Sequence, residues 1–161
     1  MPGETRISIS RFVKAPPSEI FRIVTDPTMQ VEIDGSGMLK GTPSSRRVEA
    51  VGDTFEVDMD RESLGDVPMG KYKVLNTVTR IIPDALLEWN VGSAEWGPYG
   101  HVYGWEIAAV GSDESEVTNY CDWSGLPENV REHFPIVPMA MMEKSVEKLA
   151  DLVAHKTKSP D

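Results

Sequence analysis

Residues 138–156 read PMAMMEKSVEKLADLVAHK, and apolar side chains recur in this stretch every three or four residues. In a helix this spacing gathers the apolar side chains into one stripe, while the charged side chains fall on the opposite side. The stripe consists of Met139, Met142, Val146, Leu149 and Val153. The stretch therefore predicts an amphipathic surface helix from Pro138 to about Lys156, placed like a lid over an apolar cavity.

The sequence before this helix alternates polar and apolar residues, which is typical of strands with one buried face. Seven such runs cover residues 5–15, 45–51, 54–62, 71–82, 86–91, 101–110 and 116–123. Short turns between them predict an antiparallel meander. Pro16-Pro17-Ser18-Glu19 starts one short helix after the first strand, Asp26-Pro27 ends it, and a second helical turn spans residues 28–33.

The fold class that follows is α+β, with a seven-stranded curved antiparallel sheet wrapped around the long C-terminal helix. The two short helices come directly after strand one. At 161 residues the chain is expected to form a single domain over residues 1–156, followed by a disordered tail at 157–161.

Composition excludes several classes of function. With 16 basic and 26 acidic residues the net charge is −10, which repels phosphate backbones, so we expect no nucleic-acid partner. Cys121 is the only cysteine and there are three histidines, so we expect no structural metal. No membrane span or signal-peptide core is visible, which predicts a cytoplasmic protein. Gly35-Ser36-Gly37 follows no strand and opens no helix, and we expect no cofactor.

Short motifs mark turns and strand starts along the chain. They are VKAPPSEIF at 13–21, Asp26-Pro27, GSG at 35–37, VGDTF at 51–55, NTV at 76–78, PDALLEW at 83–89, WE at 105–106 and VTNYCDW at 117–123. These motifs resemble those of the START-like superfamily, also called Bet v 1-like or SRPBCC, which includes the polyketide cyclase/dehydrase family. The resemblance covers nearly the whole chain. It implies a helix-grip fold with a deep, mostly apolar cavity between the sheet and the C-terminal helix. Members bind lipids, hormones or polyketides, and some catalyse aromatic cyclisation or dehydration without a shared catalytic motif.

Alternation along the strands predicts which side chains enter such a cavity. The expected ligand-binding residues are Phe55, Val57, Met59, Tyr72, Asn76, Trp89, Trp105, Asn119, Met139 and Met142. For the last strand the preferred register turns Val117, Asn119, Cys121 and Trp123 inward, and the alternative register turns Thr118, Tyr120 and Asp122 inward. Buried polar groups need hydrogen-bond partners, so polar residues of the inward sets would orient an apolar ligand.

Three residues are candidates for acid–base chemistry, namely His101, Tyr103 and, in the alternative register, Asp122. Each has an ordinary structural explanation as well. His101 begins its predicted strand, where histidines are more often solvated, and Tyr103 is more often a wall residue than a reactive group.

Two connections, at 63–70 and 92–100, are longer and richer in Gly and Pro than turns require. Their large apolar side chains either form the mouth of a pocket or cap the open ends of the sheet. These side chains are Leu64, Met69, Trp96 and Tyr99.

Three functions are compatible with these patterns. The first is a protein that binds a small apolar ligand, lipid-, aromatic- or polyketide-like, between the sheet and the terminal helix. The second is an enzyme of the aromatase/cyclase or dehydratase (lyase) type that uses acid–base residues in the same cavity. The third is a protein-interaction module with a collapsed pocket, recognisable by having no cavity above about 300 Å³. A monomer or weak homodimer is expected.

Overall fold

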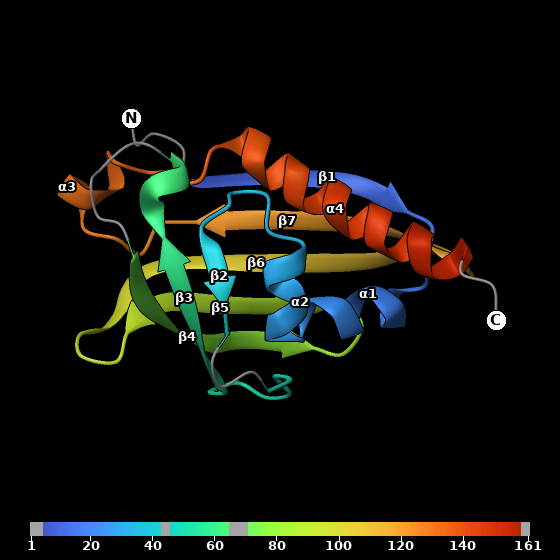
Figure 1. Ribbon diagram of the computed structural model, residues 1–161, viewed down its shortest axis with the longest axis horizontal. Helices are drawn as coiled ribbons and strands as arrows, with labels where there is room; N and C mark the ends of the chain where they lie inside the picture. The colour runs from blue at the N-terminus through green and yellow to red at the C-terminus, as the bar shows by residue number, and fades with distance from the viewer. Residues whose placement is uncertain (1–4, 43–45, 65–70, 159–161) are drawn as a thin grey trace.

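The computed structural model describes residues 5–42, 46–64 and 71–158. Its centre is a seven-stranded antiparallel sheet that curves around the C-terminal helix (Figure 1). The strands are β1 (Arg6–Val13), β2 (Leu39–Gly41), β3 (Thr54–Asp60), β4 (Lys71–Ile82), β5 (Leu86–Ser93), β6 (Gly97–Gly111) and β7 (Glu114–Asp122). Their order in the sheet is β1-β7-β6-β5-β4-β3-β2, so the first and last strands of the chain are neighbours.

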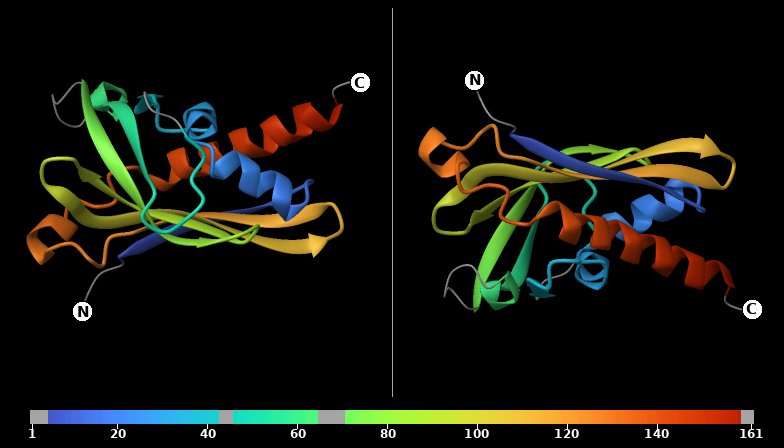
Figure 2. Two further views of the ribbon diagram at one scale, coloured as in Figure 1. Left: turned by 90° about the horizontal axis from the view of Figure 1, so that it is seen from below. Right: turned by 90° about the horizontal axis from the view of Figure 1, so that it is seen from above.

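Helices α1 (Pro17–Val24), α2 (Pro27–Glu32) and α4 (Met139–Lys158) lie on the concave face of the sheet (Figure 2). The 3-10 turn η1 (Arg61–Leu64) follows β3, and α3 (Glu128–Arg131) comes between β7 and α4 in the chain. Pro17 opens α1 at a position where its missing N–H costs nothing. Asp26 then caps α2, because its Oδ1 accepts the backbone N–H of Thr28 at 3.0 Å.

The predicted α+β, helix-grip arrangement is confirmed, including seven strands and two short helices after the first strand. One predicted strand is wrong, since residues 46–50 form no strand. The backbone N–H groups of Glu49 and Ala50 instead donate to the Asp53 carboxylate, at 2.8 and 2.9 Å, and turn the chain. The seventh strand is β2, whose three residues are too few to show the polar and apolar alternation of a strand.

The limits of several other elements also differ from expectation, and those of β6 and α4 bear on the candidate site and the tail. β6 begins at Gly97 rather than at residue 101, which places His101 inside the strand. α4 continues to Lys158, into the stretch expected to be a disordered tail, and residues 159–161 lie outside the described residues. Within the described ranges, no helix is both long and apolar enough to cross a membrane.

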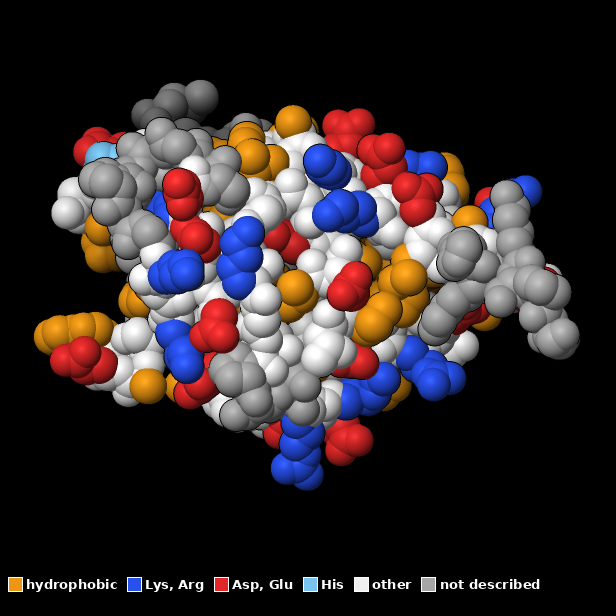
Figure 3. All heavy atoms as spheres, in the orientation of Figure 1, with side chains coloured by type: hydrophobic (Ala, Val, Ile, Leu, Met, Phe, Trp, Pro, Cys, Tyr) orange, Lys and Arg blue, Asp and Glu red, His pale blue; other side chains and the backbone are white. Residues whose placement is uncertain are grey.

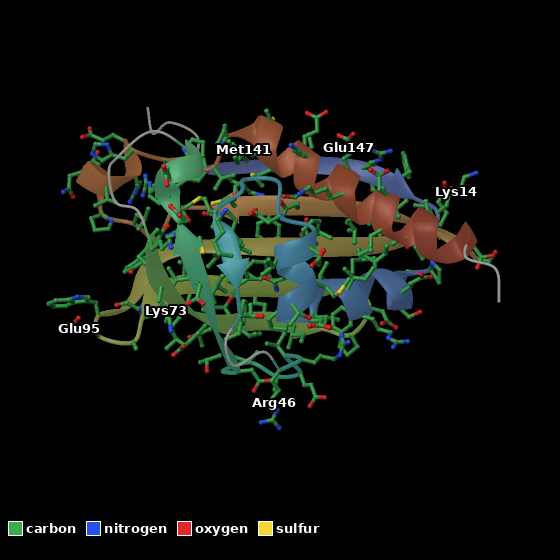
Figure 4. The ribbon with its side chains drawn as sticks, viewed as in Figure 1. Lys14, Arg46, Lys73, Glu95, Met141 and Glu147 are labelled. Carbon is green, nitrogen blue, oxygen red and sulfur yellow. The ribbon has the colours of Figure 1, made fainter. Side chains whose placement is uncertain are left out.

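The core fills one half of the space under α4. Val146, Leu149 and Val153 pack there with Ile20 and Val24 of α1, and all five side chains are at most 1% exposed. Charged side chains of both signs cover the outward side of α4 (Figure 3), and Glu147 points away from the sheet (Figure 4). The C-terminal half of α4 therefore closes a packed core, and the N-terminal half remains available to border a cavity.

The loop between α2 and β2 is fastened directly to α4. The backbone N–H of Gly35 donates to Ser145 Oγ at 2.8 Å, and Lys148 Nζ donates to the Asp34 carbonyl oxygen, also at 2.8 Å. Gly35 lies so close to the helix that a Cβ built on it would be 2.2 Å from the carbonyl oxygen of Met141. This contact fixes the height of α4 above the sheet.

On the convex face, Tyr120 lies flat over Gly104 of the neighbouring strand and is 1% exposed. Its hydroxyl donates to Glu88 Oε2 at 2.5 Å, and the Arg6 guanidinium lies 4.1 Å from the ring centroid. Burial, followed by the hydrogen bond to Glu88, raises the pKa of Tyr120. Tyr120 thus belongs to the outer side of the sheet, as the preferred register requires, although it is buried.

Candidate functional site

A cavity of about 370 Å³ lies between the concave face of the sheet and the elements that cover it. This volume is within the range of small-molecule sites. The sheet contributes Val57, Met59, Tyr72, Val74, Asn76, Trp89, Val91, Tyr99, His101, Tyr103, Trp105 and Asn119. The cover contributes Gln30, Ile33, Asp34, Ser36, Met38 and Leu39 from α2, the loop after it and the start of β2, and Leu126, Val130, Phe134, Ile136, Val137, Met142 and Ser145 from the C-terminal region. Most of these side chains are aliphatic or aromatic.

A row of rings follows the sheet wall of the cavity. Trp89 and Tyr103 are paired across β5 and β6, and their rings stack with centroids 6.3 Å apart. His101 stands two residues before Tyr103 on the same face, so its ring meets Tyr103 edge-on at 5.8 Å. Phe134, from the segment before α4, closes the row with its centroid 4.8 Å from that of His101. The row provides a flat apolar surface suited to a ring-containing molecule.

Two buried polar atoms in this wall have no hydrogen-bond partner among the described residues. They are Oδ1 of Asn76 and Nδ1 of His101. The Asn76 side chain is on β4 and the His101 side chain on β6, and the two residues are 5% and 6% exposed. A buried acceptor left unpaired costs about 1–3 kcal/mol. Both of these unpaired atoms belong to residues that line the same cavity, so each lowers the stability of the protein there.

Other polar groups of the cavity are already engaged by the protein. Asn119 Nδ2 donates to the Gly104 carbonyl oxygen at 3.0 Å, and Gln30 Nε2 donates to the Val24 carbonyl oxygen at 2.9 Å. The Asp34 carboxylate accepts three hydrogen bonds from Ser36 and Leu39, at 2.7 to 3.2 Å. These side chains hold the walls in place.

Burial keeps His101, Tyr103 and the nearby Cys121 neutral at pH 7. Burial lowers the pKa of His101 to about 4, and burial followed by the nearby Cys121 thiol raises the pKa of Tyr103 well above its usual value. Burial also raises the pKa of Cys121 to about 12. Asp122 does not line the cavity, and its Oδ1 accepts the backbone N–H of Ser124 at 2.9 Å. Among the described residues, no three His, Cys, Asp or Glu side chains form a metal-binding group.

The buried imidazole predicts a pH dependence of stability. Between pH 6.5 and 4 the unfolded chain binds a proton at His101 that the native protein does not, so stability falls as the pH falls through this window. From pH 7.5 to 5.0 we expect the wild type to lose about 2 kcal/mol of unfolding free energy more than His101→Phe. Urea unfolding of both proteins at the two pH values measures this, and groups common to both cancel. Equal losses would contradict a buried neutral imidazole.

Eight of the ten residues predicted to bind a ligand line the cavity, and two do not. Phe55 is buried, but its ring packs edge-on against Trp89 with centroids 5.9 Å apart, and Trp89 forms the wall. Met139 is 45% exposed and lies outside the cavity. Three residues at 100° each place Met139 about 60° from Met142 around the helix axis, at the margin of the buried stripe.

Of the two candidate mouth residues whose side chains are described, Tyr99 borders the cavity and Trp96 does not. The Tyr99 ring stacks on His101 with centroids 6.3 Å apart, and the residue is 45% exposed. Trp96 is 79% exposed and lies away from the cavity. The backbone of Leu64 ends η1, and Met69 lies outside the described residues.

Sequence patterns predicted α4 and Met142 as part of the cover, but they missed the irregular segments that complete it. Phe134 and Val137 belong to the irregular segment between α3 and α4, and Met38 belongs to the loop before β2. Side chains in irregular segments do not follow the regular spacing of a helix or strand. The positions of the apolar residues therefore do not predict which of them point into the cavity. The one available signal is the position of Phe134 and Val137, each directly before a proline.

No protein-family model matches the chain. The chain is 30% identical, over 160 residues, to uncharacterized proteins from two strains of Mycobacterium tuberculosis. The match covers 95% of this chain and 66% of each relative, so the chain spans just under two thirds of the length of these relatives.

Solved structures resemble the chain over nearly its full length. A structural-genomics protein from Chromobacterium violaceum superposes with a TM-score of 0.67 at 16% identity, covering 98% of this chain and 99% of that one. Truncated norcoclaurine synthase from Thalictrum flavum superposes with a TM-score of 0.60 at 15% identity, covering 92% of each chain. At these identities the likeness concerns the fold alone. The curved sheet, the helix that it grips and these neighbours together show a Bet v 1-like fold.

Proposed function

We propose that the protein binds a small, mostly apolar molecule in the cavity between the sheet and α4. The observation that carries this proposal is the cavity of about 370 Å³ with its wall of stacked rings and aliphatic side chains. An apolar ligand would gain roughly 25 cal/mol for each Å² of apolar surface removed from water. The row from Trp89 to His101 favours a ligand with rings over one with a flexible chain.

Catalysis of the cyclase or dehydrase type has less support. An efficient acid or base has a pKa near the working pH. The pKa of His101 is lowered to about 4 and that of Tyr103 is raised, while Asp122 lies outside the cavity. The rings of His101 and Tyr103 lie close enough to touch one ligand, but their proton affinities suit holding it better than transforming it.

The interaction-module alternative also has less support. It predicted a collapsed pocket, and the volume of about 370 Å³ exceeds the lower limit of about 300 Å³ for ligand sites. Trp96, at 79% exposure, is the side chain on which that alternative would depend.

Filling the cavity tests the proposal. Val91 lines the wall between Asn76 and His101, so Val91→Trp should place an indole where the ligand would lie. We expect Val91→Trp to lower the affinity for the neutral apolar dye Nile red by about tenfold or more, measured by its fluorescence. The matched control is Val110→Trp, because Val110 is 46% exposed and does not line the cavity. Absence of dye binding by the wild type, or equal binding by all three proteins, would refute the proposal.

Native mass spectrometry of the freshly purified wild type complements the dye. A bound molecule that disappears in Val91→Trp and persists in Val110→Trp would support the proposal and supply the ligand for identification.

A further inference from the structure

The two unpartnered acceptors of the cavity lie on one line across the sheet. Asn76 of β4 is paired with Val91 of β5. In the pairing of β5 with β6, Asn90 lies opposite Val102 and Gly92 lies opposite Pro98. Val91 therefore lies opposite a bulge in β6 that spans residues 99–101 and ends at His101. Neighbouring strands are about 4.8 Å apart, which places the backbones of Asn76 and His101 roughly 10 Å apart. Both side chains point into the cavity from this line.

Three other polar side chains of the cavity have hydrogen-bond partners within the protein. The side-chain amides of Asn119 and Gln30 donate to the Gly104 and Val24 carbonyl oxygens. The Asp34 carboxylate accepts hydrogen bonds from its own loop. Asn76 and His101 both line the cavity, and Oδ1 of Asn76 and Nδ1 of His101 have no hydrogen-bond partner among the described residues. We infer that the ligand is an uncharged, ring-containing molecule with hydroxyl groups at two ends, one reaching Oδ1 of Asn76 and the other Nδ1 of His101.

The chemistry of the two atoms selects this ligand class. A hydroxyl donates to an amide oxygen or to an unprotonated ring nitrogen, and it also accepts if the ring nitrogen carries the proton. A carboxylate only accepts, so it leaves Oδ1 of Asn76 unpaired and brings a charge into an apolar site. The Asp34 carboxylate, which borders the same cavity, opposes a second negative charge.

Arg61 also borders the cavity and is the only lysine or arginine among its described lining residues. It begins η1, directly after β3, and a carboxylate ligand would have to reach this side chain for compensation. The inference therefore predicts a preference that a set of matched probes can measure, namely diol over dicarboxylate on the same ring system.

The test, which rests on the proposed function, uses three probes on one scaffold. They are 2,6-dihydroxynaphthalene, naphthalene and naphthalene-2,6-dicarboxylate, each titrated into the wild type by intrinsic fluorescence. We expect the diol to bind at least about tenfold more tightly than the other two, because only the diol can donate hydrogen bonds to the otherwise unpaired buried atoms.

Substitutions then assign the preference to the two residues. Asn76→Leu and His101→Phe remove the acceptors while keeping the side-chain size, and each should weaken the diol about tenfold and leave naphthalene within about threefold. The matched control is Asn90→Leu. Oδ1 of Asn90 is also buried and unpartnered among the described residues, but Asn90 does not line the cavity. This variant should bind all three probes like the wild type.

The outcomes separate this inference from the proposed function. Equal binding of naphthalene and the diol would overturn the inference and leave apolar binding intact. Tighter binding of the dicarboxylate would also overturn it, and loss of that binding in Arg61→Gln would assign recognition to the arginine. If the wild type binds none of the probes and no Nile red, the proposed function fails together with the inference. The wild-type comparison does not depend on the folding of any variant.

Discussion

Gly35→Ala should destabilise the protein by about 3 kcal/mol or more. The new Cβ would lie 2.2 Å from the Met141 carbonyl oxygen and 2.7 Å from the Ser145 nitrogen, both of them backbone atoms of α4. A helix cannot move two backbone atoms independently, so α4 has to rise from the sheet or the loop has to retreat. Either movement stretches the hydrogen bond from Gly35 to Ser145 Oγ and widens the cavity at that side. Urea unfolding measures the loss.

The matched control for this prediction is Gly111→Ala at the end of β6. A Cβ on Gly111 would find its nearest neighbour, Cβ of Glu114, at an ordinary contact distance of 3.9 Å. This substitution should change the unfolding free energy by no more than about 1 kcal/mol, since it mainly restricts the unfolded chain. A Gly35→Ala protein as stable as Gly111→Ala would show that the loop is not seated against the helix.

Gly104→Ala should cost about 3 kcal/mol through a contact on the opposite face of the sheet. A Cβ there would lie 2.3 to 2.5 Å from the tip of the Tyr120 ring. The ring is 1% exposed, so moving it aside exposes apolar surface and breaks the hydrogen bond from its hydroxyl to Glu88. Thermal and urea unfolding at pH 7 measure the cost.

A double-mutant cycle identifies the cause of that loss. In the background of Tyr120→Ala the ring is absent, so Gly104→Ala should then change the unfolding free energy by less than about 1 kcal/mol. If Gly104→Ala is equally costly in both backgrounds, the backbone of β6 rather than the ring requires glycine. The cavity lies on the other face, so Nile red binding at temperatures below unfolding should be the same in Gly104→Ala and the wild type.

The strands and helices that sequence patterns predicted correctly are long and periodic. The alternation in residues 71–82 predicts β4 with both of its limits, and the stripe from Met142 to Val153 predicts the buried side of α4. Short or irregular elements gave no such signal. β2 has three residues, and in residues 46–50 a polar and apolar alternation surrounds Val48, which is the only buried residue of that stretch.

The residues of the candidate site likewise include some that strand alternation predicts and others that it does not. Sheet residues such as Val57, Asn76 and Trp89 were predicted because residues two apart on a strand share a face. His101 was expected on the inward face but at the very start of its strand, where a solvated histidine is the alternative, because Gly97, Pro98 and Gly100 are typical of a loop. β6 in fact begins at Gly97 and buries His101. The partners of buried atoms are equally invisible in a sequence. That Asn119 has a partner while Oδ1 of Asn76 has none depends on packing in three dimensions.

The position of β1 at the edge of the sheet has a consequence for the assembly of the protein. β1 pairs with β7 alone, and Arg6 lies opposite Asp122. During synthesis at about 5–20 residues per second, β1 waits on the order of 10 s for its partner. Such distant pairing is also slow in refolding, because a long loop has to close first. Asn119 of β7 and Met142 of α4 line the cavity, so its wall is incomplete until the chain has been synthesised past residue 142.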